Sequence, residues 1–372
     1  MKPLQGLKVI DFSTLLPGPL ASLILAEAGA DVVKLEKPES GDEMRTYEPK
    51  WGEDSVNFAL LNRGKKSLAV DLKDPDARAG LLSLIGEADV LVEQFRPGVM
   101  ARLGLDYETL AAHFPRLIYC SITGYGQDGP KKHRAGHDLN YIAETGLLAL
   151  SMGKSERVLP PALIADIAGG TYPAVINILL ALLQRERTGN GCHLDIAMTE
   201  SLFTLMYWAI GNGHTGCWPQ NGGDLVTGGT PRYRLYDTQD GETVAVAAIE
   251  DKFWGNFCDA IGLEQALRDD DRDPVATADA VRSKIAAKPG RHWRRVFDEV
   301  ECCCSVVIGL EEALADSHVA ARGLFSRTVT NSRGQTMPAL PVPLDRAFLG
   351  VARPAAAPGL GAHNAESLDE GA

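Results

Sequence analysis

The 372-residue sequence is short of positive charge. Lys and Arg total 37 against 49 Asp and Glu, which gives a formal net charge of −12. Proteins that coat nucleic acid or an anionic membrane bind through basic faces. This balance argues against a nucleic-acid or a membrane partner, although local basic patches remain compatible with it.

A long uninterrupted apolar run is also missing. The longest, around Val175–Leu183, is interrupted by Asn177 and ends at Gln184. That is well short of the roughly 20 residues that span a bilayer. The N-terminal MKPLQGLKVIDF has neither the apolar segment nor the cleavage site of a signal peptide. We therefore expect a cytoplasmic protein.

The seven cysteines show no CxxC spacing, and Cys302–Cys304 are consecutive. Reduced thiols fit this pattern best, and the triplet is more typical of buried packing than of a redox site. His133 and His137 are four residues apart, but Gly136 disfavours a common helix and a third ligand is not evident. The sequence therefore predicts no metal site.

Three well-known site motifs are absent. The sequence has no G-x-G-x-x-G followed by a helix, no P-loop and no G-x-S-x-G elbow. This argues against a standard dinucleotide or ATP domain and against an α/β-hydrolase.

What is present is a regular alternation in the first 125 residues. Short β-branched runs are separated by segments of helical periodicity, such as Pro17–Ala28 and Pro75–Ile85. The predicted strands are Lys8–Phe12, Asp31–Glu36, Ser67–Leu72, Asp89–Glu93 and Leu117–Thr123. Alternating strands and helices predict an α/β fold with a mostly parallel sheet and helices on both faces.

Ligands of such sheets bind beyond the carboxyl ends of the strands. The predicted strands lead there to Ser13, Lys37, Gln94–Arg96 and Gly124–Gly126. We expect a ligand site at this edge.

Helices follow at about Asp138–Leu150, Ala168–Arg187 and Glu200–Ile210, with a strand at Cys192–Ala197. Further along, Arg232–Asp237 and Glu242–Ile249 flank an Asp-Gly turn, which predicts an antiparallel hairpin.

The change from parallel α/β to a hairpin followed by helices predicts two domains. Residues 1–210 and 326–372 would form a large domain, 211–230 a glycine-rich linker and 231–325 a small α+β domain. The Ala-, Pro- and Gly-rich tail after Val351 is expected to be only partly ordered.

His137 is the first candidate for chemistry. Asp138 is a plausible N-cap, so the imidazole would lie just before a helix N-terminus, where the dipole favours the neutral base. A histidine that only hydrogen-bonds backbone at the helix start fits the pattern as well.

Asp166 precedes a strongly apolar helix and is either an N-cap or a functional carboxylate. Gly169 and Gly170 follow in the predicted first turn, where the lack of side chains permits close approach of a ligand or of another chain. Glu250 ends the hairpin's apolar run, and a functional carboxylate and a helix cap are equally compatible with that position.

Basic residues gather where loops are expected, at Arg63–Lys66, Arg96 and Lys131–Arg134. In an acidic protein such groups suit a phosphorylated ligand, and solvated loop charges are the alternative.

Taken together, these stretches resemble the family III CoA-transferase superfamily (CaiB/BaiF-like) over nearly the whole chain. The superfamily segments include GLKVIDFSTLLPGPLASLILAEAGADVVKLEKPE, LNRGKKSLAVDLK and LIYCSITGYGQDGP. The α-methylacyl-CoA racemase branch is indicated by AGHDLNYIAETG, ALIADIAGG and GGTPRYRLYDTQDGETVAVAAIE. Transferases usually have an aromatic residue where His137 stands.

The resemblance implies an interlocked homodimer with a Rossmann-like large domain built from both termini and a smaller domain between them. It implies a CoA thioester as substrate and no separate cofactor. The CoA-binding residues would be Lys37, Arg63, Lys65, Lys66, Arg96, Asp138 and Tyr141.

For the reaction, the resemblance implies that His137 and Asp166 are acid and base on opposite faces of the substrate α-carbon, with Glu250 orienting His137. The activity would be racemisation of 2-methyl-branched acyl-CoA through an enolate. Backbone N–H groups near Gly169 and Gly170 would stabilise the enolate oxygen. The alternative is a family III CoA-transferase in which Asp166 attacks the thioester and forms an aspartyl-CoA thioester.

Overall fold

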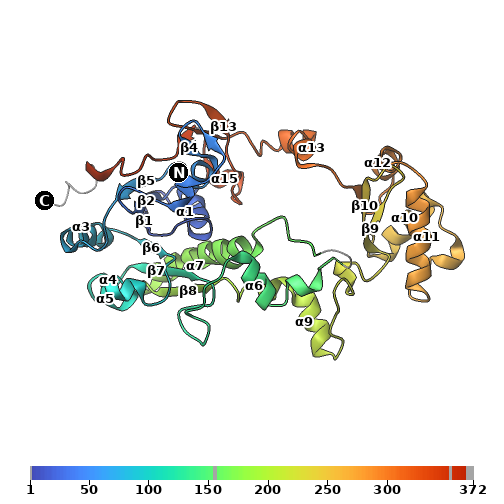
Figure 1. The fold of residues 1–372 in the computed structure, drawn as a ribbon, viewed down its shortest axis with the longest axis horizontal. Helices are drawn as coiled ribbons and strands as arrows, with labels where there is room; N and C mark the ends of the chain where they lie inside the picture. Colours follow the sequence, from blue (N-terminus) through green and yellow to red (C-terminus); the bar gives the residue numbers. More distant parts are fainter. Residues whose placement is uncertain (1, 154–156, 352–353, 366–372) are drawn as a thin grey trace. The chain divides into compact units, whose positions relative to one another are not determined.

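The computed structural model describes residues 2–153, 157–351 and 354–365. The chain divides into two compact units. The first contains Met1–Thr145, Pro160–Leu205 and Ala320–Ala372, and the second contains Gly146–Leu159 and Met206–Val319 (Figure 1). The predicted limits of independent domains stay a prediction.

A six-stranded parallel sheet forms the centre of the first unit. Its order is β5-β2-β1-β6-β7-β8. The strands are β1 (Lys8–Asp11), β2 (Asp31–Glu36), β5 (Lys66–Ala69), β6 (Val90–Glu93), β7 (Ile118–Thr123) and β8 (His193–Ala197). The four central strands β2, β1, β6 and β7 are almost entirely buried, as strands covered on both faces must be, whereas the edge strands β5 and β8 are partly exposed. The α/β prediction is confirmed.

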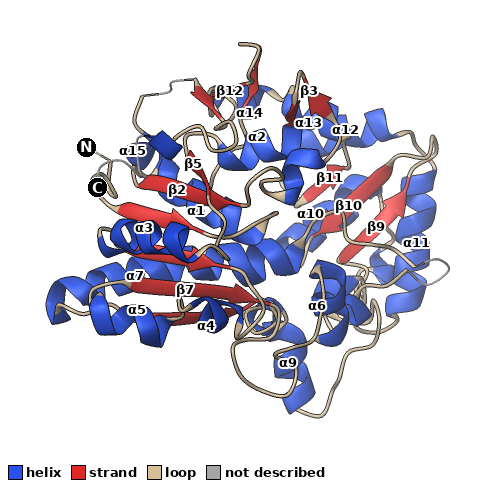
Figure 2. Ribbon diagram, turned by 60° about the vertical axis from the view of Figure 1, so that its left-hand side comes forward, coloured by secondary structure: helices blue, strands red, loops and turns tan. Residues whose placement is uncertain are grey.

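Helices cover both faces of this sheet (Figure 2). On one face α3, α4 and α5 pack on alternate strand residues such as Ile10, Leu35 and Leu91. On the other face α1 and α7 contact each other and the strands. The bounds are α1 (Pro17–Glu27), α2 (Val56–Asn62), α3 (Pro75–Gly86), α4 (Val99–Leu103), α5 (Tyr107–His113), α6 (Asp138–Glu144), α7 (Tyr172–Thr188) and α8 (Leu202–Leu205).

Both ends of the chain contribute to the first unit. Asn364 Oδ1 accepts a hydrogen bond from the backbone N–H of Ala69 at the end of β5, at 2.9 Å. The smaller elements are η1 (Glu43–Thr46), the hairpin β3 (Lys50–Trp51) and β4 (Asp54–Ser55), α15 (Arg346–Leu349), and a sheet of β13 (Thr336–Pro338), β12 (Thr328–Thr330) and β14 (Ala355–Ala356). Parts of the tail after Val351 lie outside the described residues.

In the second unit the predicted hairpin is confirmed. Strands β9 (Tyr233–Asp237) and β10 (Thr243–Ala247) are antiparallel, with Gly241 at φ +83° in the turn, and β11 (Cys304–Val306) pairs with β10. Helices packed with this sheet bury Trp254, Phe257 and Trp293. The other elements are η2 (Leu148–Leu150), α9 (Tyr207–His214), η4 (Leu225–Thr227), α10 (Asp251–Ile261), η5 (Gln265–Leu267), α11 (Pro274–Ala286), α12 (Gly290–Glu299), α13 (Leu310–Leu314) and α14 (Ser317–Ala321), which extends past the unit's last residue.

Three predicted helices differ from the structure. Asp138–Leu150 is interrupted after Glu144, because Gly146 has φ +88°. The helix predicted from Glu200 to Ile210 is split at Met206 into α8 and α9, and α9 runs to His214, inside the segment predicted as a linker. The third difference concerns Asp166 and is described with the site.

One helix, Ala165–Thr188, is long and apolar enough to cross a membrane by length and composition, and one-third of its most apolar window is buried. The segment before Val175 is less continuous in its apolar residues, because it includes Asp166, Gly169, Gly170 and Thr171. A single helix of this kind is weak evidence for a membrane span, since core helices pass the same test.

Candidate functional site

A cleft of about 430 Å³ lies at the carboxyl ends of the parallel strands. This is the edge where the sequence predicted a ligand site. Its walls are Leu15 and Pro17 after β1, Gln94–Pro97 after β6, Ile122–Tyr125 at the end of β7, Lys132 and Arg134–His137 before α6, Asn140 and Tyr141 on α6, and Asp166 and Met198.

His137 and Asp166 line this same cleft, although 28 residues separate them in the chain. His137 is exposed and its backbone N–H donates to Asn140 Oδ1 at 3.0 Å, which fixes the start of α6. Asp138 links the two positions, because its Oδ1 accepts the backbone N–H of Asp166 at 3.0 Å.

The carboxyl group of Asp166 has a raised pKa of about 6. Burial is the largest cause, the nearby Asp138 carboxylate adds to it, and His137 opposes it. A carboxyl group with this pKa exchanges its proton near neutral pH, as acid–base catalysis requires.

The backbone around both residues differs from the prediction. His137, not Asp138, is the N-cap of α6, and Asp138 is the first helical residue. Asp166 is not an N-cap either, because the helix begins earlier, with a π-helical turn η3 (Ala165–Thr171) that continues into α7. π-helical turns of this kind are frequent at functional sites.

The two glycines of η3 do not line the cleft. A Cβ on Gly169 would lie 2.1 Å from the carbonyl oxygen of Met198, and one on Gly170 would lie 2.9 Å from the Met198 side chain. Their role is therefore close packing of η3 against the chain after β8. The expectation that they expose N–H groups to an enolate is wrong.

Tyr141 forms the floor of the cleft beside these residues. Its hydroxyl donates to the carbonyl oxygen of Gly136 at 2.6 Å, and its ring meets that of Tyr125 edge to face. Burial, followed by the charge of Asp166, raises the pKa of Tyr141 to about 12. A Cβ on Gly124 or Gly136 would lie 2.5 or 2.7 Å from the Tyr141 ring, so both positions require glycine.

Three cationic side chains, Arg96, Lys132 and Arg134, line the cleft. Arg134 also pairs with Glu144 at 3.1 Å. The predicted set of CoA-binding residues included Arg96 and omitted the other two, although the basic run Lys131–Arg134 was a visible signal in the sequence.

Two predicted CoA-binding residues, Arg63 and Lys65, are buried. Arg63 Nε donates to Glu27 at 2.9 Å, and Lys65 Nζ donates to Ser22 and lies 3.4 Å from Asp11. Burial lowers the pKa of Lys65 to about 7 despite the Asp11 carboxylate. Both side chains are hydrogen-bonded inside the first unit and neither lines the cleft, although Arg63 lines a separate cavity of about 450 Å³. Their contact with CoA stays a prediction.

The other predicted residues lie in different places. Lys66 is the first residue of β5, at the amino-terminal edge of the sheet, and pairs with Asp31 at 2.9 Å. Lys37 is exposed directly after β2 and is not among the residues that line the cleft. Asp138 is 5% exposed. Glu250 is an exposed N-cap of α10 in the second unit, and its pairing with His137 stays a prediction.

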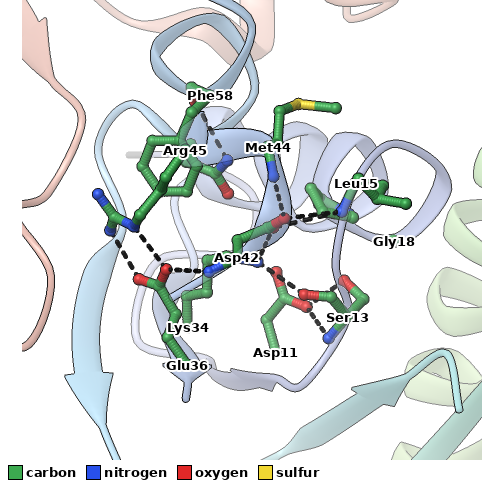
Figure 3. A network of polar contacts seen from close by, with 12 residues as sticks. Asp11, Ser13, Leu15, Gly18, Lys34, Glu36, Asp42, Met44, Arg45 and Phe58 are labelled. Atoms are coloured by element: carbon green, nitrogen blue, oxygen red, sulfur yellow. Dashed lines mark hydrogen bonds and ion pairs between the residues drawn. The ribbon is translucent and has the colours of Figure 1, made fainter. Parts of the chain in front are cut away.

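A buried polar network supports the loop between β1 and α1 (Figure 3). Leu15, which lines the cleft, has φ +63°, and its N–H donates to Asp42 at 3.2 Å. Asp42 pairs with Lys34 at 2.9 Å, and Lys34 Nζ donates to the carbonyl oxygen of Ser13 at 2.6 Å. Fully buried ions hold this loop in one conformation.

Within the described ranges, no group of three or more His, Cys, Asp or Glu side chains is arranged to hold a metal ion. The cleft at the strand ends combines an imidazole, a carboxyl group of raised pKa and three cationic side chains.

Comparisons with known proteins show the family of the chain. The chain is 35% identical to the α-methylacyl-CoA racemase of Mus musculus, over 99% of this chain and 93% of that protein. It is 34% identical to the acetyl-CoA:oxalate CoA-transferase of Acetobacter aceti, over 91% of this chain and 88% of that protein.

Among solved structures, a CaiB/BaiF family protein from Brucella suis has a TM-score of 0.81 at 28% identity and 99% coverage of both chains. The profile of CoA-transferase family III matches residues 4–364. The chain therefore belongs to CoA-transferase family III.

Proposed function

We propose that the protein is a racemase or epimerase of 2-methyl-branched acyl-CoA thioesters. The observation that carries this proposal is that His137 and Asp166 line one cleft, with the pKa of the Asp166 carboxyl group raised to about 6. Inversion needs a base on one face of the α-carbon and an acid on the other.

The reaction would proceed through an enolate. One group removes the α-proton, which is acidified by the thioester carbonyl, and the other returns a proton to the opposite face. Each positioned proton transfer contributes roughly 10²–10⁴-fold to the rate. Glu250 is proposed to orient His137.

The walls of the cleft suit such a substrate. Apolar side chains, among them Leu15, Phe95 and Met198, would contact the branched acyl chain, and Arg96, Lys132 and Arg134 would attract the CoA phosphates. Lys37 and Tyr141 remain part of the proposed CoA site. Lys37 would contact CoA outside the cleft, and Tyr141 would lie near the thioester. Asp138, which is buried, would act indirectly, by accepting the backbone N–H of Asp166 and so positioning that residue.

The competing activity uses the same carboxylate. In a CoA-transferase Asp166 would attack the thioester carbonyl and then carry CoA, and this needs no base on the opposite face. The sequence similarity to a CoA-transferase favours this second candidate, whereas the histidine at position 137 favours the first.

Incubation with a 2-methylacyl-CoA in D₂O separates the two activities. A racemase introduces deuterium at the α-carbon with no acceptor acid present. A transferase exchanges labelled CoA only when a second carboxylic acid is added. Transfer without α-deuteration would contradict the proposal.

We also propose that the protein is a homodimer, with a second copy covering α7. This helix exposes Ile176, Leu180 and Leu183 at 56%, 57% and 63%. An apolar stripe of this kind marks an interface more often than a free surface. The interlocked arrangement implied by the family resemblance would bury it.

A further inference from the structure

A second cavity, of about 310 Å³, lies beside the cleft, at the end of β6, the middle of β7 and the start of β8. Its walls include Glu93, Tyr107, Ser121 and His193, and Arg96 lines both this cavity and the cleft. None of these side chains except Arg96 has a role in the proposed reaction.

Glu93 is the last residue of β6 and is 3% exposed. Its Oε2 accepts the backbone N–H of Phe95 at 2.8 Å, and the Ser121 hydroxyl lowers the pKa of the same carboxyl group by hydrogen bonding. Ser121 Oγ lies 3.0 Å from His193 Nε2. Glu93 and Ser121 are direct neighbours in the sheet register, so Glu93, Ser121 and His193 form a row of polar side chains on three adjacent strands.

The row of polar side chains reaches the wall of the cleft at Glu93. The segment Gln94–Pro97, which follows Glu93 directly, lines the cleft over its whole length. Its other anchor is Gln94 Oε1, which accepts the N–H of Gly18 at 3.0 Å. The Phe95 N–H bond to Glu93 and the Gln94 bond to Gly18 therefore fix the backbone that presents Phe95 and Arg96.

We propose that Glu93 is a positioning residue that shapes the segment Gln94–Pro97 for binding of the CoA ester. The inference rests on the proposed function, because it concerns the ligand of the same cleft. An ionised Glu93 carboxylate can accept hydrogen bonds from Phe95 and Ser121 at the same time. When the carboxyl group is protonated, one of its oxygens carries a proton and becomes a donor, so it is a weaker acceptor.

The charge state of Glu93 is sensitive to pH. Burial raises its pKa to about 7, the bonds from Ser121 and Phe95 oppose this, and Asp195 adds to it. The other titratable groups near it are Tyr119 and Cys120 on β7, both with pKa values raised mainly by burial, and His193 on β8. The same cavity is also lined by Arg96 after β6 and by Asp106, Tyr107 and Glu108 at the start of α5.

Burial lowers the pKa of His193, so this ring is neutral where Glu93 titrates. With Glu93 ionised, Ser121 donates to it and a ring N–H of His193 donates to Ser121. Protonation of Glu93 reverses the first of these bonds and weakens the anchor of Phe95. Affinity for CoA is therefore expected to fall as the pH drops through about 7.

The test measures the dissociation constant of coenzyme A by titration calorimetry between pH 5.5 and pH 8.5, as conditions chosen to bracket the pKa of about 7. Glu93→Gln keeps the shape of the side chain and removes its ionisation. It is expected to weaken binding several-fold at high pH and to flatten the pH profile. Glu108→Gln, at an exposed carboxylate of the same cavity, is the control and should follow the wild type.

Ser121→Ala gives a second measurement, the midpoint pH of the affinity profile, which would not change if Glu93 had a merely structural role. Loss of its hydrogen bond should raise the pKa of Glu93 further, so the midpoint of the affinity profile should shift to higher pH. Circular dichroism checks that each variant folds.

Glu93→Gln profiles that coincide with those of Glu108→Gln, or an unshifted midpoint in Ser121→Ala, would overturn the inference and leave the proposed function intact. Absence of CoA binding by the wild type at every pH would overturn both.

Discussion

At the scale of single residues, the cleft keeps a carboxyl group in an environment that disfavours its charge. Asp166 is half-buried beside Asp138, and the charge of His137 only partly offsets these two effects, so ionisation of Asp166 costs free energy that the fold must supply. Such strain is a common feature of sites that need a group poised to transfer a proton.

Asp166→Asn should stabilise the protein at neutral pH. The folded state holds the Asp166 proton more tightly than the unfolded chain does, with a pKa of about 6 against about 3.9. Wild-type stability therefore declines as the pH rises from about 4 to 6, and Asn removes this loss. Urea unfolding at fixed protein concentration should show a gain of about 1–2 kcal/mol at pH 8 and almost none at pH 4. Equal gains at both pH values would argue against the raised pKa.

Gly124→Ala should lower both stability and activity. The new methyl group would lie 2.5 Å from the Tyr141 ring and displace it from the cleft. Overpacking of this kind costs roughly 1–3 kcal/mol. Gly255→Ala is the control, because nothing lies within 4 Å of its added Cβ in α10, and it should be neutral or stabilising. Thermal unfolding compares the two, and an unaffected Gly124→Ala would contradict the packing argument.

At the scale of elements, the cleft depends on segments held together by buried hydrogen bonds. The Thr171 hydroxyl of η3 donates to the carbonyl oxygen of Pro17 at the start of α1, at 2.8 Å. The Asp138–Asp166 bond ties α6 to η3. The loop before α1 is held in turn by Asp42 and Lys34.

Asp42→Ala should be strongly destabilising. It removes the carboxylate that is paired with the fully buried Lys34 ammonium and frees the loop at Leu15. Breaking a buried ion pair costs about 3–5 kcal/mol. Glu301→Ala, which breaks the exposed pair with Lys252, should cost less than about 1 kcal/mol. If urea unfolding shows similar losses of unfolding free energy for the two variants, the Asp42–Lys34 pair does not hold the loop before α1.

The elements also show how far the sequence predicts the site. The strand ends and the region before α6 were predictable, because apolar runs bounded by turns mark them. The position of His137 at the start of a helix follows from the same pattern. The π-helical turn at Asp166 was not predictable, because it spans only the seven residues Ala165–Thr171, which are too few and too small to show a change of apolar period. The burial of Arg63 and Lys65 was hidden as well, because their carboxylate partners, Glu27 and Asp11, are 36 and 54 residues away.

At the scale of the whole molecule, the exposed apolar face of α7 is the main feature that the first unit leaves uncovered. It lies on the helix that begins with the Asp166 turn, so any partner seated there would contact an element of the cleft directly. Assembly and activity are therefore expected to depend on each other.

Leu180→Glu should convert the proposed dimer into monomers and reduce activity. The substitution places a charge in the proposed apolar interface. Leu82→Glu, on α3, is the control for an isolated exposed leucine and should leave the dimer unchanged. Light scattering after size exclusion gives the mass of each form. If the wild type is instead a monomer that sediments with anionic vesicles, the dimer proposal is wrong and the apolar face of α7 contacts a membrane.

The central claim, that His137 and Asp166 act on opposite faces of one α-carbon, is tested most directly by solvent deuterium exchange with each 2-methylacyl-CoA epimer separately. We predict that His137→Ala and Asp166→Asn both lose inversion by at least about 10²-fold, and that each retains α-deuterium exchange with only one epimer, a different one for each variant. Inversion that survives in either variant, or exchange of both epimers by one of them, would contradict the account.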